Sequence, residues 1–375
     1  LGVDINPEIV EVINQGIPHI KEKGLSDSLA KVVKSGFLRA SISPQKSDIF
    51  IIAVPTPLIK ESESIHKPNT DFVFSAIKSI LKVLSKGNTI IIESTSPVGT
   101  TQKIAKYVFQ LTGLSSDDIN YAYCPERVIP GKIMEELENN NRIVGGLTDK
   151  ASTLVRDFYA TFTKGLIEVT NTKTAEMVKL AENSFRDVNI AFANEISLLC
   201  DHLNIDTKDL IKLSNYHPRV NILSPGIGVG GHCIAIDPWF LVAEDPNITT
   251  LIQSARIVNK RKTDWVISKI QEFIKKHDQD INKDSSIGCL GLSYKPDVDD
   301  IRESPALEIV RRLIELKINA VVCEPNISSI EGIDLLDIDT LLRSSEIIVI
   351  LVAHESFKEI DLSGKKVIDF CGVID

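Results

Sequence analysis

Two short aliphatic runs constrain the fold of this chain more than any other feature. Residues 48–54 (DIFIIAV) and 89–95 (TIIIEST) carry consecutive isoleucines and then meet polar residues or proline. Strands that are buried on both faces have this composition, and they occur in parallel sheets covered by helices. Between the runs, residues 71–86 place apolar side chains at helical spacing and stop at Gly87. The pattern predicts a doubly wound α/β fold, with further strands at 119–124, 142–145 and 166–170.

The pattern changes after residue 171. Residues 173–203 keep a helical period without glycine or proline, and helical stretches at 207–214 and 248–275 flank a Gly/Pro-rich loop at 217–238. A second α/β pattern follows, with strands expected at 285–294, 319–323, 346–353 and 366–370 and a helix at 305–316. We therefore predict three domains: an α/β domain over 1–171, a helical centre over 172–263 and a second α/β domain over 264–375.

Composition excludes several classes of protein. Of the 375 residues, 43% are hydrophobic and 25% charged, as in an ordinary globular chain, and the net charge of −9 argues against a general nucleic-acid binder. No apolar run approaches the roughly 18 residues of a membrane span. The six cysteines are scattered without a CxxC pair, which favours a reducing, cytoplasmic location, and no Cys/His cluster has the spacing of a metal site.

Polar residues follow the predicted strands of the first domain. Asp4 sits where an acid can bind the adenosine ribose of a dinucleotide, although an Asp before Asn-Pro also suits a turn or helix cap. Thr56 and Thr95 lie in turns at strand ends, where ligands bind in open α/β sheets; plain turn chemistry is the alternative. Glu126 follows another strand and suits a general base or a water-orienting group, or else an exposed carboxylate or a partner for Arg127.

The long helix and the glycine-rich loop carry the stronger signals. Lys179 and Asn183 are four residues apart and point to one side, where two donors can stabilise an oxyanion; a solvated helix face is the alternative. The loop PGIGVGGHCIAID brings four glycines within six positions directly before Cys233, with Asp237 four residues later. Backbone donors beside a thiol favour a nucleophile, whereas a buried, inert role suits three of the other cysteines better: Cys200, Cys289 and Cys323.

Cations follow the first strand of the second α/β domain. Lys295 ends the strand region, and Arg302 lies in the charged loop that comes next. Cations at a strand end suit a pyrophosphate or a carboxylate, and a surface network of ion pairs is the alternative.

Taken in order, six motifs resemble the nucleotide-sugar 6-dehydrogenases of the UDP-glucose dehydrogenase superfamily over essentially the whole chain. They are VPTP, ESTSPVGT, YCPERVIPG, AEMVKLAENSF, PGIGVGGHCIAIDPW and GLSYKPDVDDIRES. The chain is most similar to the UDP-N-acetyl-D-mannosamine dehydrogenases, because Pro130 and Ile236 stand where UDP-glucose dehydrogenases tend to have other residues. The resemblance implies two Rossmann-like domains joined by a helical dimerisation centre.

The resemblance also implies roles for individual residues. The catalytic group comprises Cys233 as nucleophile, Lys179 and Asn183 as oxyanion donors, Glu126 and Thr95 as water-positioning groups or base, and Asp237 beside the thiol. The UDP-sugar group comprises Arg127, Val128, Arg186, His217, Arg219, Gly228, Tyr294 and Lys295, with Arg219 reaching a neighbouring subunit. The NAD group comprises Asp4, Thr56, Thr95 and Arg302.

The implied reaction is a four-electron oxidation at C6 of UDP-N-acetyl-D-mannosamine that uses two NAD per turnover and supplies surface-polysaccharide precursors. It passes through a thiohemiacetal and a thioester on Cys233. The resemblance further implies a homodimer, and the charge and the short apolar runs lead us to expect no nucleic-acid or membrane partner. A UDP-N-acetylglucosamine or UDP-glucose 6-dehydrogenase is the alternative enzyme, and an inactive protein that binds a UDP-sugar is the alternative from another class.

Two departures from the family pattern concern the chain ends. The family has a first strand, a GxGxxG turn and a first helix before the strand that corresponds to residues 1–5, so we expect a longer natural protein by roughly 30 residues. A chain truly without that unit is expected to fail in stable NAD binding. Near the other end, Cys371 stands where the family often has a basic substrate contact.

Overall fold

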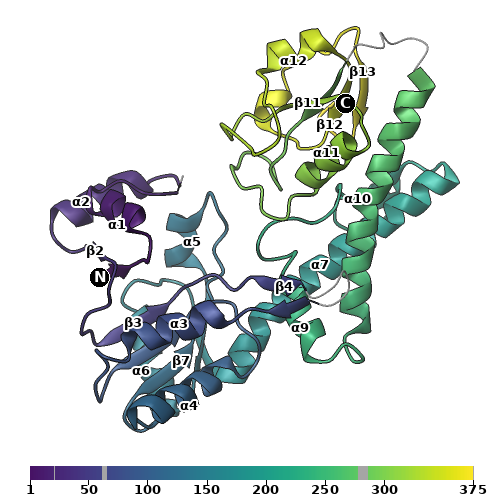
Figure 1. Ribbon diagram of the computed structural model, residues 1–375. Coiled ribbons are helices and arrows are strands. Elements are labelled where there is room, and N and C mark those ends of the chain that lie inside the picture. The colour runs from purple at the N-terminus through teal and green to yellow at the C-terminus, as the bar shows by residue number, and fades with distance from the viewer. Residues whose placement is uncertain (21, 61–65, 278–285, 375) are drawn as a thin grey trace. The chain divides into compact units, whose positions relative to one another are not determined.

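The computed structural model describes residues 1–20, 22–60, 66–277 and 286–374 (Figure 1). The chain folds into two compact units, Leu1–Ala181 and Glu182–Asp375. The longest helix, α7 (Thr172–Leu203), begins in the first unit and ends in the second. It matches the uninterrupted helical period of the sequence.

A five-stranded sheet forms the centre of the first unit, with the strand order β3-β6-β7-β8-β9. Its strands are β3 (Ile49–Ile52), β6 (Thr89–Ile92), β7 (Asn120–Tyr123), β8 (Arg142–Gly146) and β9 (Ile167–Asn171). Neighbouring strands run parallel except β7 and β8. Ile90, Ile91 and Ile92 of β6 are fully buried, so this strand is covered on both faces, as the isoleucine run predicts.

Helices cover the two faces of this sheet. They are α3 (Asp71–Ile80), α4 (Thr100–Thr112) and α6 (Asp149–Tyr159). A shorter helix of the same unit, α5 (Ile133–Asn139), has no buried residue. Val73 of α3 and Ile104 of α4 share an apolar cluster with Ile90, whereas Val155 of α6 belongs to a second cluster with Ile91. Because successive strand residues point to opposite faces, the helices lie on both sides of the sheet, and the doubly wound prediction is confirmed.

Smaller pieces complete the first unit. β1 (Gly2–Val3) pairs in parallel with β2 (Ala40–Ser41), apart from the five-stranded sheet. The remaining elements are the helices α1 (Pro7–Asn14) and α2 (Leu25–Lys34) and the antiparallel pair β4 (Leu58–Lys60) and β5 (His66–Pro68). At the start of α1 the side chain of Asn6 accepts a hydrogen bond from the backbone N–H of Glu8, and Pro7 begins the helix.

The second unit starts with helices. They are the second part of α7, then α8 (Thr207–Ser214), α9 (Pro238–Glu244) and α10 (Thr250–His277). Residues 217–237 contain no helix or strand, as expected for the glycine-rich loop. α10 runs without a break through residue 264, where the sequence predicts a domain boundary.

A four-stranded parallel sheet with the order β11-β10-β12-β13 completes the second unit. Its elements are β10 (Ser286–Leu290), α11 (Pro305–Glu315), β11 (Ala320–Cys323), α12 (Ile338–Ser344), β12 (Ser345–Ile350), a 3-10 turn at Glu355–Phe357 and β13 (Lys366–Asp369). Ile270 of α10 and Val310 of α11 share one apolar cluster with Cys289, and Leu341 of α12 shares another with Leu290. The second α/β pattern of the sequence is thus confirmed, with helices on both faces.

Some expected elements end earlier in the structure, such as the strand expected at 346–353, which ends at Ile350. The helix predicted over 71–86 ends at Ile80, and the strand predicted over 285–294 ends at Leu290. The early end of the strand leaves the segment from Gly291 onward as a loop at the carboxyl end of β10. None of the helices in the described part of the chain combines the length and the apolar character needed to cross a membrane.

Candidate active site

In the first unit, three predicted residues follow adjacent parallel strands. Thr56 comes after β3, Thr95 after β6 and Glu126 after β7, and all three are partly exposed. The carboxyl ends of parallel strands share one sheet edge, so the structure brings these residues to the same edge. Asp4 follows β1, is also partly exposed, and its carboxylate accepts a hydrogen bond from the backbone N–H of Asn6 at 2.8 Å.

Glu126 is held by both of its carboxylate oxygens. Oε1 accepts backbone hydrogen bonds from Arg127 at 2.7 Å and from Val128 at 3.2 Å. Oε2 forms an ion pair with Arg142 at 3.3 Å. The side chain is still 31% exposed, so one face of the carboxylate can reach a ligand or a water. Its ionic partner in the structure is therefore Arg142, whereas the sequence pointed to Arg127.

Sequence reasoning missed Arg142. Its guanidinium is buried, donates to Thr163 at 3.0 Å, and stacks 4.7 Å from the ring centroid of Tyr159. The hydroxyl of Tyr159 in turn donates to Glu93, whose pKa is raised mainly by burial. The sequence did offer one signal for Arg142, because an arginine that begins a predicted buried strand needs a nearby anionic partner.

The part of α7 that belongs to the first unit contains two charged residues that bond to loops following the sheet strands. Lys179 is buried, and its Nζ donates to the backbone carbonyl of Glu126 at 2.9 Å. Glu176, which the sequence analysis did not single out, accepts hydrogen bonds from the backbone of Gly99 at 2.5 Å and of Thr101 at 2.8 Å. Burial raises the pKa of Glu176 even though these donors oppose the rise. The glutamate thus fixes the start of α4 to the helix that carries Lys179.

In the second unit, the structure brings Asn183 and Asp237 into contact. Nδ2 of Asn183 donates to Oδ2 of Asp237 at 2.5 Å, and both residues are buried. Asp237 also closes the turn that begins at Cys233, since its backbone N–H donates to the carbonyl of Cys233 at 2.8 Å. The pair therefore ties the glycine-rich loop to α7.

The thiol of Cys233 differs in its surroundings from the cysteines of the core. Cys233 is partly exposed, whereas Cys124, Cys289 and Cys323 are buried. Burial raises the pKa of Cys124 and Cys323 to about 11 and that of Cys289 to about 12, which keeps those thiols protonated. Of these four, Cys233 has the exposure that a nucleophile needs.

Glycine is required where the Cys233 loop meets its neighbours. A Cβ on Gly230 would lie 2.8 Å from the Cβ of Tyr294, and one on Gly231 would lie 2.9 Å from that ring. Gly228, at φ +145°, packs in the same way against Thr263 and Pro305. The loop therefore lies directly on the segment that follows β10, which includes the predicted substrate residue Tyr294.

Charged residues border this contact. Burial raises the pKa of Tyr294, with Asp300 and Cys233 adding to the rise. Arg302 binds Asp300 through two hydrogen bonds of Nε at 2.9 and 3.1 Å and an ion pair at 2.6 Å. Lys295 lies with Nζ 5.8 Å from the centroid of the Tyr294 ring. In the structure Arg302 thus forms an ion pair with Asp300, as in the alternative to a ligand contact that the sequence left open.

The remaining predicted residues lie on exposed parts of the second unit. Arg186 extends from α7, and His217 and Arg219 follow α8. The backbone N–H of Arg219 donates to Nδ1 of His217 at 3.3 Å. The NAD candidates are thus divided between the units, with Asp4, Thr56 and Thr95 in the first and Arg302 in the second.

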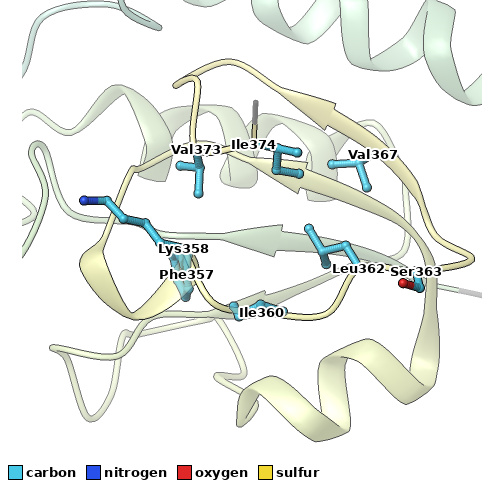
Figure 2. Close-up of a pocket in the computed structure, with 8 residues that line it drawn as sticks. All are labelled: Phe357, Lys358, Ile360, Leu362, Ser363, Val367, Val373 and Ile374. Atoms are coloured by element: carbon cyan, nitrogen blue, oxygen red, sulfur yellow. The ribbon is translucent and has the colours of Figure 1, made fainter.

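A hollow of about 510 Å³ lies elsewhere on the second unit, beside β13 and the 3-10 turn (Figure 2). Its lining residues are Phe357, Lys358, Ile360, Leu362, Ser363, Val367, Val373 and Ile374, none of which is a predicted site residue. Its largely aliphatic wall has no acid, base or nucleophile besides a lysine and a serine, so it is not the candidate active site. Among the described residues, no group of three His, Cys, Asp or Glu side chains is placed to hold a metal ion.

Comparison with known proteins covers the whole chain. Residues 1–163, 173–261 and 288–375 match the NAD-binding, central and UDP-binding domains of the UDP-glucose/GDP-mannose dehydrogenase family. The UDP-N-acetyl-D-mannosamine dehydrogenase of Campylobacter jejuni is 47% identical, over 99% of this chain and 93% of that protein. The NDP-N-acetyl-D-galactosaminuronic acid dehydrogenase of Ralstonia solanacearum is 43% identical, over 100% and 90%.

A solved structure agrees with these sequence matches. The UDP-D-ManNAc dehydrogenase of Pyrococcus horikoshii superposes with a TM-score of 0.91 at 37% identity and covers 100% of this chain and 90% of that one. Three domain matches in the expected order, with relatives of this identity over at least 90% of their length, leave one assignment. The chain belongs to the UDP-glucose/GDP-mannose dehydrogenase family.

Proposed function

We propose that this chain is an NAD-dependent UDP-N-acetyl-D-mannosamine 6-dehydrogenase that oxidises the C6 alcohol of its substrate to a carboxylate. The observation that carries the proposal is the 47% identity, across 99% of the chain, to a protein of that name. The chemistry of the site supports the same conclusion, because oxidation of an alcohol to an acid without release of the aldehyde needs a covalent holding group.

The partly exposed thiol of Cys233 supplies that group. In the proposed sequence, C6 loses a hydride and its hydroxyl loses a proton, so the alcohol becomes an aldehyde; NAD would supply the hydride acceptor. The thiolate sulfur then bonds to the aldehyde carbon and gives a thiohemiacetal. Loss of a second hydride and of the hydroxyl proton converts this adduct to a thioester, and water breaks the C–S bond to release the carboxylate and the thiol.

Lys179 and Asn183 suit the stabilisation of the oxyanion in these steps, because both are donors on one side of α7. Each already uses a donor in the structure, Lys179 toward the carbonyl of Glu126 and Asn183 toward Asp237. Glu126 and Thr95 lie at one sheet edge and suit the orientation of the hydrolytic water. Asp237 fixes the orientation of the Asn183 amide.

The cofactor supplies the hydride acceptor, and two NAD molecules are used per substrate. Asp4, Thr56 and Thr95 fit its ribose and phosphate groups, because they are partly exposed polar side chains after strands of the first unit. Arg302 is proposed as a further contact. For the UDP-sugar we propose the residues that the family resemblance assigns: Arg127, Val128, Arg186, His217, Arg219, Gly228, Tyr294 and Lys295.

Assembly and location complete the proposal. Large apolar side chains on α7 are exposed, with Phe185 at 69%, Phe192 at 50% and Leu199 at 51%, which supports a homodimer through the helical segment 172–263. Light scattering should give twice the mass of one chain. We propose the cytoplasm as the compartment, because the thiol of Cys233 must stay reduced. We also retain the three-part division at residues 171 and 263.

A second substrate has a specific observation in its favour. The Ralstonia solanacearum relative, at 43% identity, is named for an N-acetyl-D-galactosaminuronic acid, so relatives of nearly equal identity to this chain carry the names of different acetamido sugars. UDP-N-acetylglucosamine and UDP-glucose remain further alternatives.

Initial rates with each UDP-sugar decide between these substrates. We expect UDP-N-acetyl-D-mannosamine to have the highest kcat/KM and to yield two NADH per sugar consumed. A higher kcat/KM with another UDP-sugar would transfer the assignment to that sugar. Release of no NADH from any of them, with UDP binding intact, would identify an inactive UDP-sugar-binding protein.

A further inference from the structure

A buried carboxylate lies under the segment that carries Tyr294 and Lys295. Glu324 directly follows β11, and its side chain is completely buried. Oε2 accepts hydrogen bonds from the backbone N–H groups of Leu292 at 2.7 Å and Ser293 at 3.1 Å. Burial alone would raise the pKa of Glu324, but hydrogen bonds from His354, Leu292 and Asn326 lower it below its usual value. The carboxylate is thus an internal anion that is satisfied by the protein itself.

His354 joins this carboxylate to the far end of the same segment. The imidazole is completely buried, and its Nδ1 accepts a hydrogen bond from the backbone N–H of Asp297 at 2.9 Å. Because a backbone N–H can only donate, the neutral ring must carry its proton on Nε2. Nε2 lies 3.1 Å from Oε2 of Glu324 and donates to it. The two side chains therefore hold both ends of the Ser293–Asp297 segment.

The position of Glu324 in the topology explains why this contact matters. In a dinucleotide-binding unit, the acid after the second strand binds a ribose, and the backbone N–H groups after the first strand face the pyrophosphate. In the second unit β10 is the first strand and β11 the second. Glu324 turns inward and binds the N–H groups of Leu292 and Ser293, which a dinucleotide would otherwise use. The turn after β10 is therefore closed from inside, and only its outer side chains are presented to a ligand.

Those outer side chains lie against the candidate nucleophile loop. Tyr294 packs on Gly230 and Gly231, where an added Cβ would come within 2.8–2.9 Å of its side chain. Ser293 stiffens the same turn, since its hydroxyl donates to the carbonyl of Lys295 at 2.8 Å. A shift of the segment would therefore move both the predicted substrate residues and the surface on which the glycines rest.

We propose that Glu324 and His354 are positioning residues for the UDP-sugar, which hold the Ser293–Asp297 segment so that Tyr294 and Lys295 meet the substrate. The inference rests on the proposed function, because it takes Tyr294 and Lys295 as substrate residues. Neither Glu324 nor His354 touches the substrate.

Graded substitutions in the full-length protein test this role. Glu324→Ala and His354→Ala should raise the KM for the UDP-sugar and the Kd for UDP alone by about tenfold, which corresponds to about 1.4 kcal/mol. The kcat should stay within about threefold, and the KM for NAD should not change. Glu324→Gln and His354→Gln keep one acceptor and one donor, so they should recover part of the lost affinity.

Ser286→Ala is the matched control. Ser286 is buried at the opposite end of β10 and donates to the carbonyl of Ser344 at 2.9 Å, so its loss removes a partly buried hydrogen bond between β10 and the end of α12. This variant should lower Tm and leave the KM for the UDP-sugar and the Kd for UDP unchanged. The control separates lost stability from lost positioning.

Two results would overturn the inference. One is a lower Tm with an unchanged Kd for UDP in the alanine variants, or in the glutamine variants if the alanine variants do not fold. The other is an equal rise of the KM values for NAD and the UDP-sugar, which would indicate general loosening. A wild-type protein that produces no NADH would contradict the proposed function instead, and the ratio of UDP Kd values would still decide the role of Glu324 and His354.

Discussion

Each of the two α/β units has an acid directly after a strand, and the two acids have opposite surroundings. Asp4 follows β1, stays partly exposed, and accepts one local backbone hydrogen bond. Glu324 follows β11, is completely buried, and binds the turn of its own unit. An acid that follows a strand can therefore stay open to a ligand or close a turn of its own unit.

This difference accounts for where the candidate residues lie in each unit. In the first unit they stand at the sheet edge itself, as Thr56, Thr95 and Glu126 do. In the second unit the turn after the first strand is closed, and the candidates lie in loops, as Tyr294 and Cys233 do. The comparison predicts that Asp4 and Thr56 of the first unit act in cofactor binding, whereas Tyr294 and Cys233 of the second unit act in substrate binding and covalent chemistry.

The largest expected effect is that of Cys233→Ser, which tests whether the covalent chemistry belongs to the loop of the second unit. A hydroxyl is a poor nucleophile without a strong base, so turnover should fall by at least about 10³-fold. NADH release in steady state is the measurement. The matched control is Cys200→Ser, which changes a buried thiol of α7 that has no assigned role and should keep its activity. Full activity of Cys233→Ser would exclude a thioester.

Asn183→Ala should have the next largest effect, and it tests the link between α7 and the loop. Loss of one oxyanion donor reduces kcat by about 10²–10³-fold in other enzymes. Here Asp237 also loses the donor that lies 2.5 Å away. Asn189→Ala on the same helix is the control, because the Asn189 amide donates only to the backbone carbonyl of Phe185 among the contacts described, at 2.6 Å. Equal kcat values in the two variants would show that Asn183 has no special role.

Lys262 tests whether the second unit stabilises a second buried charge as it stabilises the charge of Glu324. It is buried, its Nζ lies 3.8 Å from the centroid of Trp265, and burial lowers its pKa from 10.5 to about 8. Between these values the unfolded chain binds a proton that the folded chain has released. The free energy of unfolding should therefore rise with pH from about 8 to 10.5, by up to about 3 kcal/mol.

Urea unfolding followed by tryptophan fluorescence measures this rise, because Trp239 and Trp265 both belong to the second unit. Lys262→Met should remove it. Lys269→Met should preserve it, since Asp201 and Glu272 raise the pKa of Lys269. A rise of the same size in all three proteins would assign it to other groups.

Some features of both units could be predicted from the sequence, and others could not. The isoleucine run of β6 and the unbroken period of α7 are local patterns, and both elements lie where the sequence places them. The glycine-rich loop identified Cys233 for a similar reason, since loop and thiol are adjacent in the chain. Local patterns therefore sufficed for the elements and for the candidate nucleophile.

The partners that hold the site could not be found in this way. Arg142 lies 16 residues from Glu126, and Glu176 lies 75 residues from Thr101. A contact of this kind depends on the strand order and on the direction of the side chains, neither of which a single sequence specifies. The hydrophobic period predicts which face of a helix or strand is buried, but it does not predict which polar groups a buried charged side chain will contact.

The smallest expected effect is that of Asp4→Asn, and it tests the comparison most directly. If the open acid binds the ribose of NAD, loss of its charge should raise the KM for NAD by about tenfold, the lower end of what a hydrogen bond to a charged group contributes. The KM for the UDP-sugar should not change, which is the reverse of the result expected for Glu324. Asp27→Asn, an exposed acid of α2, serves as the control and should alter neither value. If Asp4→Asn leaves the KM for NAD unchanged, the acid after β1 is only part of a turn, and the two units do not differ in the way their corresponding acids are used.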